Sequence, residues 1–159
     1  MKYIITDNFN NIEISENNLV LCDIDETLLY NKIYYITPKT TITTNTTPKK
    51  INLPIYTDKK GFDIFLEKIK KTNSKLYFIT SRTEDLLEFT NKQFKLMNLD
   101  SNLYPVIYCG NIDKTIRVKE NIDTSIYNKI VFIDDIKYNL YTMHCEFGDK
   151  IATYLYRRL

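Results

Sequence analysis

Four short apolar runs recur along the chain, and each is followed by a polar side chain. The runs occupy residues 19–22, 76–79, 106–109 and 130–133. They contain Leu, Ile, Val, Cys, Phe and Tyr with no alternating polar position, which is typical of strands buried on both faces. We therefore predict four strands in the interior of a parallel sheet.

Helical patterns lie between these runs. Residues 62–69 carry apolar side chains at intervals of three and four, and residues 138–147 have the length and composition of another helix. A further apolar run at residues 151–155 predicts a last strand, which we place at an edge of the sheet. Strands that alternate with helices favour right-handed crossovers. The predicted fold is α/β, a Rossmann-like parallel sheet sandwiched by helices, in a single domain spanning residues 1–159.

Polar side chains stand where the predicted strands end or where the following helix begins. They are Asp23, Asp25, Thr80, Lys114, Asp134 and Asp135. Because the carboxyl ends of parallel strands meet at one edge of a sheet, we expect these side chains to converge in one crevice. Four acids, a hydroxyl and an ammonium are the groups that phosphoryl transfer requires.

Asp23 and Asp25 are the most informative pair. Residues two apart on an extended segment point to the same side, so we expect both carboxylates to project together. Two like charges about 4 Å apart repel by roughly 4 kcal/mol at an effective dielectric constant of about 20. A divalent cation, a cationic side chain or protonation must offset that repulsion.

The ordered set of motifs resembles the haloacid dehalogenase (HAD) superfamily of aspartate-nucleophile phosphatases. The first motif of that family, Asp-x-Asp-x-Thr, matches residues 23–27, and the second, a strand that ends in Thr or Ser, matches Thr80. The third motif is a lone lysine, matched by Lys114, and the fourth is an acidic pair, matched by Asp134 and Asp135. The order along the chain is also that of the family.

The resemblance implies a role for each matched residue. Asp23 would attack phosphorus and form an aspartyl-phosphate, and Asp25 would protonate the leaving oxygen and then activate water. Thr80 would donate a hydrogen bond to the phosphate, and Lys114 would supply positive charge. The residues expected to contact the substrate are Thr80, Ser81, Arg82 and Lys114.

The resemblance also implies a metal ion. A site built from carboxylates and a main-chain carbonyl suits a small, hard cation, which argues for Mg²⁺. The expected ligands are Asp23, the main-chain oxygen of Asp25, and Asp134 or Asp135. With one histidine in the chain, a histidine-rich metal site is excluded.

Three positions near the motifs bear on the substrate. Glu26 stands where the commonest version of the first motif has glycine, a variant similar to that of secreted-type acid phosphatases and of phosphatases that act on phosphorylated protein tails. Arg82 either holds a second anionic group of the substrate or is a solvated first-turn residue. Lys119 competes with Lys114 for the cationic role, but five positions along a helix rotate a side chain by about 140°, and the earlier lysine lies closer to the strand tip.

The resemblance covers residues 19–140, with an unmatched insertion at residues 31–57 that we predict to be a small cap or flap. Its low-complexity, Pro-flanked part is residues 37–48. A small cap leaves an open site, which makes protein or polynucleotide phosphate ends candidate substrates. Tyrosines near the insertion can stack on a base or surround a phosphotyrosine, although the composition favours packing within the cap. They are Tyr30, Tyr34, Tyr35 and Tyr56.

The composition fits one enzyme domain of 159 residues with a net charge of +2. Positive and negative charges are nearly balanced, so the composition gives no strong electrostatic indication of binding to duplex DNA or to an anionic membrane. No membrane-spanning run or long apolar leader occurs, so we expect a cytoplasmic protein without disulfides. Cys22 adjoins Asp23, but strand alternation places it on the opposite side, where core packing is the better interpretation.

These observations predict a Mg²⁺-dependent phosphomonoester hydrolase that acts on a phosphorylated substrate through an aspartyl-phosphate on Asp23. Two alternatives remain, a non-catalytic HAD-like binding module and a phosphatase specialised for protein or polynucleotide phosphate ends. A phosphorelay receiver domain uses similar groups, but there the acidic pair comes first and the lysine last. The sequence makes no prediction of the oligomeric state.

Overall fold

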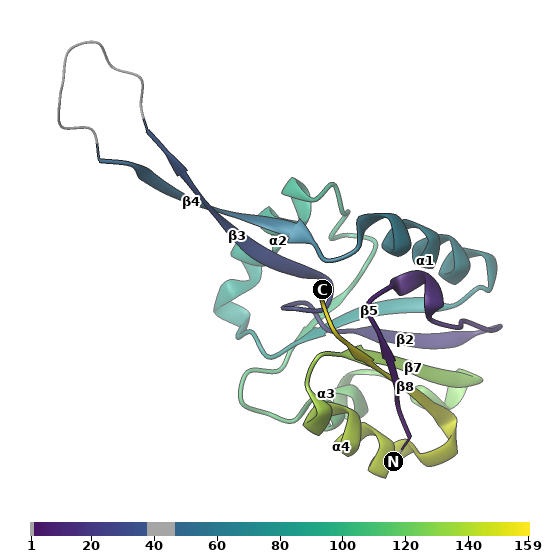
Figure 1. Ribbon diagram of the computed structural model, residues 1–159. Helices are drawn as coiled ribbons and strands as arrows, with labels where there is room; N and C mark the ends of the chain where they lie inside the picture. Colours follow the sequence, from purple (N-terminus) through teal and green to yellow (C-terminus); the bar gives the residue numbers. More distant parts are fainter. Residues whose placement is uncertain (1, 38–46) are drawn as a thin grey trace.

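A computed structural model describes residues 2–37 and 47–159. Its central sheet has six parallel strands in the order β1-β8-β7-β2-β5-β6 (Figure 1). The strands are β1 (Ile4–Thr6), β2 (Asn18–Cys22), β5 (Lys75–Thr80), β6 (Val106–Tyr108), β7 (Lys129–Asp134) and β8 (Ile151–Tyr156). The predicted α/β, Rossmann-like fold is confirmed.

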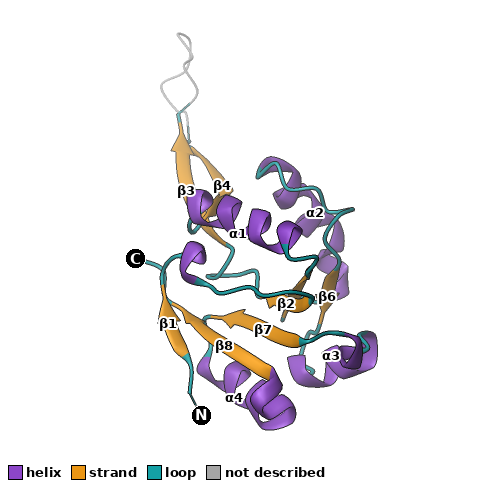
Figure 2. Ribbon diagram, turned by 90° about the vertical axis from the view of Figure 1, so that its right-hand side faces the viewer, coloured by secondary structure: helices purple, strands orange, loops and turns teal. Residues whose placement is uncertain are grey.

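Helices cover both faces of this sheet (Figure 2). The helices α1 (Lys59–Lys71) and α2 (Leu87–Leu96) lie on one face, and α3 (Lys114–Asn121) and α4 (Lys137–Phe147) lie on the other. Short 3₁₀ turns occupy Phe9–Asn11, Glu84–Leu86, Thr124–Ile126 and Gly148–Lys150.

The strand β2 shows why both faces need cover. Val20 and Cys22 pack in the core between the sheet and the helices α1 and α2. Leu19 and Leu21, which alternate with them, pack in the core between the sheet and the helices α3 and α4. All five residues of the strand are buried. An apolar run without polar alternation is therefore the expected sequence for a strand in this position.

The predicted position of the last strand is wrong. β8 pairs in parallel with β7 on one side and with β1 on the other, so it lies inside the sheet and β1 forms the edge. β1 has only three residues, and two of them, Ile4 and Ile5, are exposed. A strand this short has no recognisable hydrophobic period.

Two antiparallel strands, β3 (Leu29–Ile36) and β4 (Lys49–Tyr56), form a pair that we call the arm; it begins two residues before the predicted insertion. The arm projects away from the parallel sheet (Figure 1). At its base, Leu29 is buried and Tyr56 packs against the core. The low-complexity part of the predicted insertion lies largely outside the described residues.

The sheet order places a topological switch point beside β2. The chain runs from β2 to β5 and β6 on one side and then returns to β7 on the other side of β2. In open α/β sheets such a point creates a crevice at the carboxyl ends of the strands. Among residues 2–37 and 47–159, no helix has the length and apolar character needed to cross a bilayer.

Candidate active site

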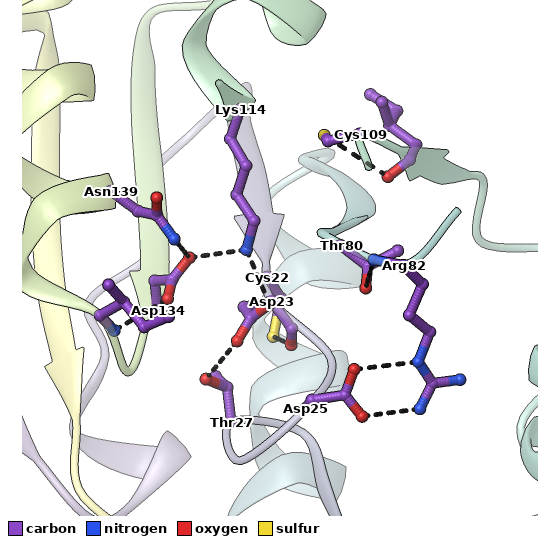
Figure 3. Close-up of polar contacts among 12 residues, drawn as sticks. Cys22, Asp23, Asp25, Thr27, Thr80, Arg82, Cys109, Lys114, Asp134 and Asn139 are labelled. Carbon is purple, nitrogen blue, oxygen red and sulfur yellow. Dashed lines mark hydrogen bonds and ion pairs between the residues drawn. The ribbon is translucent and has the colours of Figure 1, made fainter. Parts of the chain in front are cut away.

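A buried lysine joins two aspartates at the switch point (Figure 3). Lys114 Nζ donates hydrogen bonds to Asp23 Oδ1 and to Asp134 Oδ2, both at 2.7 Å. The exposed fractions of Asp23, Lys114 and Asp134 are 6%, 3% and 0%. Asp23 follows β2, Asp134 ends β7 and Lys114 begins α3, so residues far apart in the sequence meet through the crossover topology.

Further hydrogen bonds hold the two carboxylates in place. Thr27 Oγ1 donates to Asp23 Oδ2 at 3.0 Å, and Asn139 Nδ2 donates to Asp134 Oδ2 at 3.1 Å. The backbone N–H of Ile136 donates to Asp134 Oδ1 at 2.9 Å. Thr27 is the last residue of the first motif. Asn139 was not predicted from the sequence; the position of Asn139 in the first turn of α4, just after the acidic pair, is the feature that would have identified it.

Burial governs the protonation of this cluster. It raises the pKa of Asp23, as does the nearby Asp134, while Lys114 acts in the opposite direction without cancelling the effect. Burial also raises the pKa of Asp135. For Lys114, burial alone would lower the pKa, but the charges of Asp23 and Asp134 together outweigh it and raise the pKa. Three clustered carboxyl groups thus have a single ammonium beside them, bonded to two of the three, an excess of negative charge that a proton or a cation can relieve.

Three carboxylates at this point are close enough to share a cation. Asp23, Asp134 and Asp135 each offer an oxygen, and these atoms all lie within 4.8 Å of one another. Oxygen-only donors suit a hard divalent cation. The side chain of Asp25 is not a member of this group.

Asp25 turns away from Asp23 and pairs with Arg82 (Figure 3). Arg82 Nε donates to Asp25 Oδ2 at 2.9 Å and Arg82 Nη2 donates to Asp25 Oδ1 at 2.7 Å. The expectation that both carboxylates project together is therefore wrong. β2 ends at Cys22, so strand alternation does not extend to Asp25, and the two acids avoid mutual repulsion by facing different cations.

Arg82 is a buried residue that is fixed from several sides. Its Nη1 donates to Thr90 Oγ1 at 2.9 Å, and the ring of Phe89 lies 5.6 Å from the guanidinium carbon. The interpretation of Arg82 as a solvated first-turn residue is wrong, because the side chain lies almost entirely inside the protein. Its neighbour Ser81 is exposed.

Thr80 and Lys114 complete the set of predicted residues at the carboxyl ends of the strands. Thr80 is buried at the end of β5, and its Oγ1 accepts a hydrogen bond from the backbone N–H of Arg82 at 3.1 Å. Lys114, rather than Lys119, reaches the aspartates. Lys119 lies on the solvent side of α3 and pairs with Glu146 at 2.8 Å.

Glu26 has a left-handed backbone with φ of +62°. Such a backbone is strained for a residue with a Cβ, which explains why glycine suits this position in the motif. Arg158 Nε donates to Glu26 Oε2 at 3.0 Å. Glu26 and Arg158 line a pocket of about 210 Å³ together with Asp135, Tyr156 and Arg157, so the end of the chain borders the aspartate cluster. The contribution of Arg157 and Arg158 to this pocket was not predicted from the sequence.

Cys22 is not positioned for catalysis. Its side chain packs in the core under α1 and α2, and its Sγ donates a weak hydrogen bond to the main-chain oxygen of Asp23 at 3.2 Å. Burial raises the pKa of the thiol well above its ordinary value. A thiol that stays protonated is a poor nucleophile, so Cys22 behaves as a small apolar residue.

Comparison of the chain with protein-family models, curated proteins and solved structures gives no match. The function must therefore be inferred from the site itself. Three clustered carboxylates lie beside the ammonium of Lys114, which bonds to two of them, and a fourth carboxylate, that of Asp25, is held by Arg82. Such a set can bind a phosphate, a divalent cation and an acid–base group together.

Proposed function

We propose that this protein is a Mg²⁺-dependent phosphomonoester hydrolase that forms an aspartyl-phosphate on Asp23, in the manner of the HAD phosphatases its motifs resemble. The observation that carries the proposal is the convergence of Lys114 on Asp23 and Asp134 at the carboxyl ends of β2 and β7. Structural ion pairs also occur in protein cores, but a buried cluster with excess negative charge beside a switch point is a typical functional site.

The first step would join a carboxylate oxygen of Asp23 to phosphorus while the bond from phosphorus to the leaving oxygen breaks. The leaving oxygen takes its proton from Asp25. Lys114 and the hydroxyl of Thr80 would stabilise the negative charge on the transferring phosphoryl oxygens. When bound by Asp23, the main-chain oxygen of Asp25 and Asp134 or Asp135, Mg²⁺ would neutralise phosphate charge.

The second step would release phosphate. Water attacks phosphorus, Asp25 accepts a proton from that water, and the bond between phosphorus and the Asp23 oxygen breaks, which restores the free carboxylate. In the geometry described above, both oxygens of Asp25 accept hydrogen bonds from Arg82. Each oxygen keeps a second lone pair, which can take the transferred proton while the bond from Arg82 persists.

Hydrolysis of p-nitrophenyl phosphate, with and without Mg²⁺, tests the proposal. We expect Asp23→Asn to lower kcat by about 10⁴-fold or more, because an amide cannot act as the nucleophile. Asp149→Asn is the matched control, since Asp149 is exposed and precedes β8, at the amino ends of the parallel strands, away from Asp23. Hydrolysis that survives in Asp23→Asn would end the covalent mechanism. A wild-type protein inactive on every phosphomonoester would favour the non-catalytic module.

The role of Asp25 is tested with two leaving groups. Asp25→Asn is expected to lower the hydrolysis of an alkyl phosphate by about 10²- to 10⁴-fold, because a poor leaving group needs a proton. The loss for p-nitrophenyl phosphate is expected to be far smaller. Equal losses on both substrates would contradict the acid role.

A further inference from the structure

The two faces of the arm differ, and the pairing register identifies which side chains share a face. Residues directly opposite one another in an antiparallel pair point to the same side. One face, which we call the strip, carries side chains from both strands. The strip consists of Tyr30, Lys32, Tyr34 and Ile36 from β3, opposite Ile55, Leu53, Ile51 and Lys49 from β4.

The strip begins at the candidate active site. The guanidinium carbon of Arg158 lies 4.0 Å from the centroid of the Tyr30 ring, and the same arginine pairs with Glu26. Arg158 and Glu26 share their pocket with Asp135, one of the three clustered aspartates. The other face of the arm turns toward α2, because Gln93 Nε2 donates to Asn31 Oδ1 at 2.9 Å. The strip therefore adjoins the pocket beside Asp135 through the contact of Tyr30 with Arg158, whereas Asn31 on the other face bonds to α2.

The charge of the arm has one sign. Residues 27–57 contain Lys32, Lys39, Lys49 and Lys50 but no Asp or Glu, although the whole chain is nearly balanced at +2. On the strip, Lys32 Nζ lies 5.3 Å from the centroid of the Tyr34 ring. Positive charges and aromatic rings thus alternate outward from Arg158.

The strip is accessible to a ligand. The exposed fractions of Tyr34, Ile36 and Leu53 are 38%, 51% and 36%. At about 3.3 Å per residue, the six steps from Tyr30 to Ile36 extend about 20 Å, which is too long for a mononucleotide alone. Exposed apolar side chains along such a length, bordered by lysines, call for a ligand that offers flat apolar groups and repeated negative charge.

We propose that the strip binds a single-stranded polynucleotide whose terminal phosphate is the group that Asp23 attacks. A single strand offers unstacked bases to Tyr30 and Tyr34 and phosphates to Arg158, Lys32 and Lys49. Aromatic platforms combined with positive charge are the usual means of binding single strands without sequence preference. This inference depends on the proposed phosphatase function for the reaction, but not for the binding of the strand.

Hydrolysis of an oligothymidylate of ten nucleotides with a 3′- or a 5′-phosphate tests the inference. Thymidine monophosphates and p-nitrophenyl phosphate are the reference substrates. We expect the oligonucleotide to exceed the mononucleotide in kcat/KM by at least tenfold. Tyr34→Ala is expected to lower the ratio of kcat/KM for the oligonucleotide to that for p-nitrophenyl phosphate by about 5- to 100-fold, because a stacking platform is lost.

The neighbouring residues on the other face provide matched controls. Tyr35 and Lys50 oppose each other in the register and point away from the strip. Tyr35→Ala and Lys50→Gln therefore change the same residue types as the strip variants but leave the strip itself unaltered. We expect these two variants to retain the preference for the oligonucleotide. In binding measurements, Lys32→Gln combined with Lys49→Gln should reduce the slope of log K against log salt by about 1.4, whereas Lys50→Gln should leave it unchanged.

The outcomes separate the two proposals. The strip proposal is overturned, and the phosphatase stands, if p-nitrophenyl phosphate and mononucleotides are hydrolysed but the oligonucleotide is not preferred. The same conclusion follows if variants of the strip and variants of the opposite face lose the preference for the oligonucleotide equally. A strip-dependent preference for a phosphotyrosine peptide over the oligonucleotide also overturns the strip proposal. If no phosphate is hydrolysed, fluorescence anisotropy with a labelled oligothymidylate decides: binding lost only in strip variants supports the strip, and any other result overturns it.

Discussion

The aspartate cluster and the arm use lysine in opposite ways. Lys114 is buried and touches two carboxylates at 2.7 Å, whereas Lys32, Lys49 and Lys50 are exposed on a segment without acidic residues. A buried ammonium without a counter-charge is strongly destabilising, so its partners must be built into the fold. An exposed lysine needs no partner and remains available to a ligand.

This difference extends to the geometry of the two regions. In the cluster, the carboxylates of Asp23 and Asp134 are each held by more than one donor, and Lys114 joins the two, so their positions depend on several elements of the fold. In the arm, the strands β3 and β4 mainly contact each other, and few contacts join them to the helices. The cluster is therefore suited to chemistry that needs a fixed geometry, and the arm to a ligand of variable sequence.

The largest expected effect is on stability, from removal of Lys114. Lys114→Met leaves Asp23 and Asp134 buried without their ammonium, and we expect a loss of about 3–5 kcal/mol in the free energy of unfolding. Urea denaturation without Mg²⁺ at neutral pH measures it.

Lys119→Met is the control on the same helix. Lys119 is half-exposed and pairs with an exposed glutamate, so its loss is expected to change the free energy of unfolding by no more than about 1 kcal/mol. Lys49→Met on the arm is expected to behave like Lys119→Met. Similar losses for Lys114→Met and the two exposed variants would erase the contrast between buried and exposed lysines.

The next effect concerns pH and Mg²⁺. The pKa values of Asp23 and Asp135 are raised, so both groups hold protons more tightly in the folded chain than in the unfolded chain. Their stabilising contribution is complete below about pH 4 and is lost as the pH rises through the folded-state pKa values. Mg²⁺ competes with these protons, so we expect its stabilising effect to be small near pH 4.5 and to grow toward pH 7.5.

Thermal unfolding with and without Mg²⁺ at several pH values measures this linkage. At 100 times its Kd, the ion would add about 2.7 kcal/mol at neutral pH, or about 5–10 °C in Tm. Asp135→Asn should reduce the shift, whereas Lys49→Gln combined with Lys50→Gln should retain it, because the arm is not part of the cluster. A shift that is independent of pH, or that depends on the arm, would show that Mg²⁺ binds elsewhere.

The same contrast explains what could be predicted from the sequence. The strands that carry Asp23, Thr80 and Asp134 are uninterrupted apolar runs, and parallel topology then requires their ends to meet. The partner of Asp25 could not be derived, because β2 ends at Cys22 and strand alternation no longer applies at Asp25, three residues later. Similarly, the ion pair of Arg158 with Glu26 joins residues 132 positions apart, and no periodic pattern encodes such a contact.

The smallest expected effect concerns Glu26, where the cluster and the arm meet. Because the backbone of Glu26 is left-handed, we expect Glu26→Gly to be more stable than Glu26→Ala by about 1 kcal/mol. Both variants lose the ion pair with Arg158, so their difference isolates the backbone conformation. Urea denaturation of the two variants measures that difference directly.

Glu88 provides the control, because it lies exposed in the first turn of α2. In a helix the order reverses, and Glu88→Gly is expected to be less stable than Glu88→Ala by up to about 1 kcal/mol. Glu26→Gln keeps the strained backbone and removes only the charge, and since Glu26 and Arg158 are both partly exposed, its effect is expected to stay below about 1 kcal/mol. If alanine were better than glycine at both positions, the loop after Asp25 would not be strained, and Glu26 would be retained for its contact with Arg158 alone.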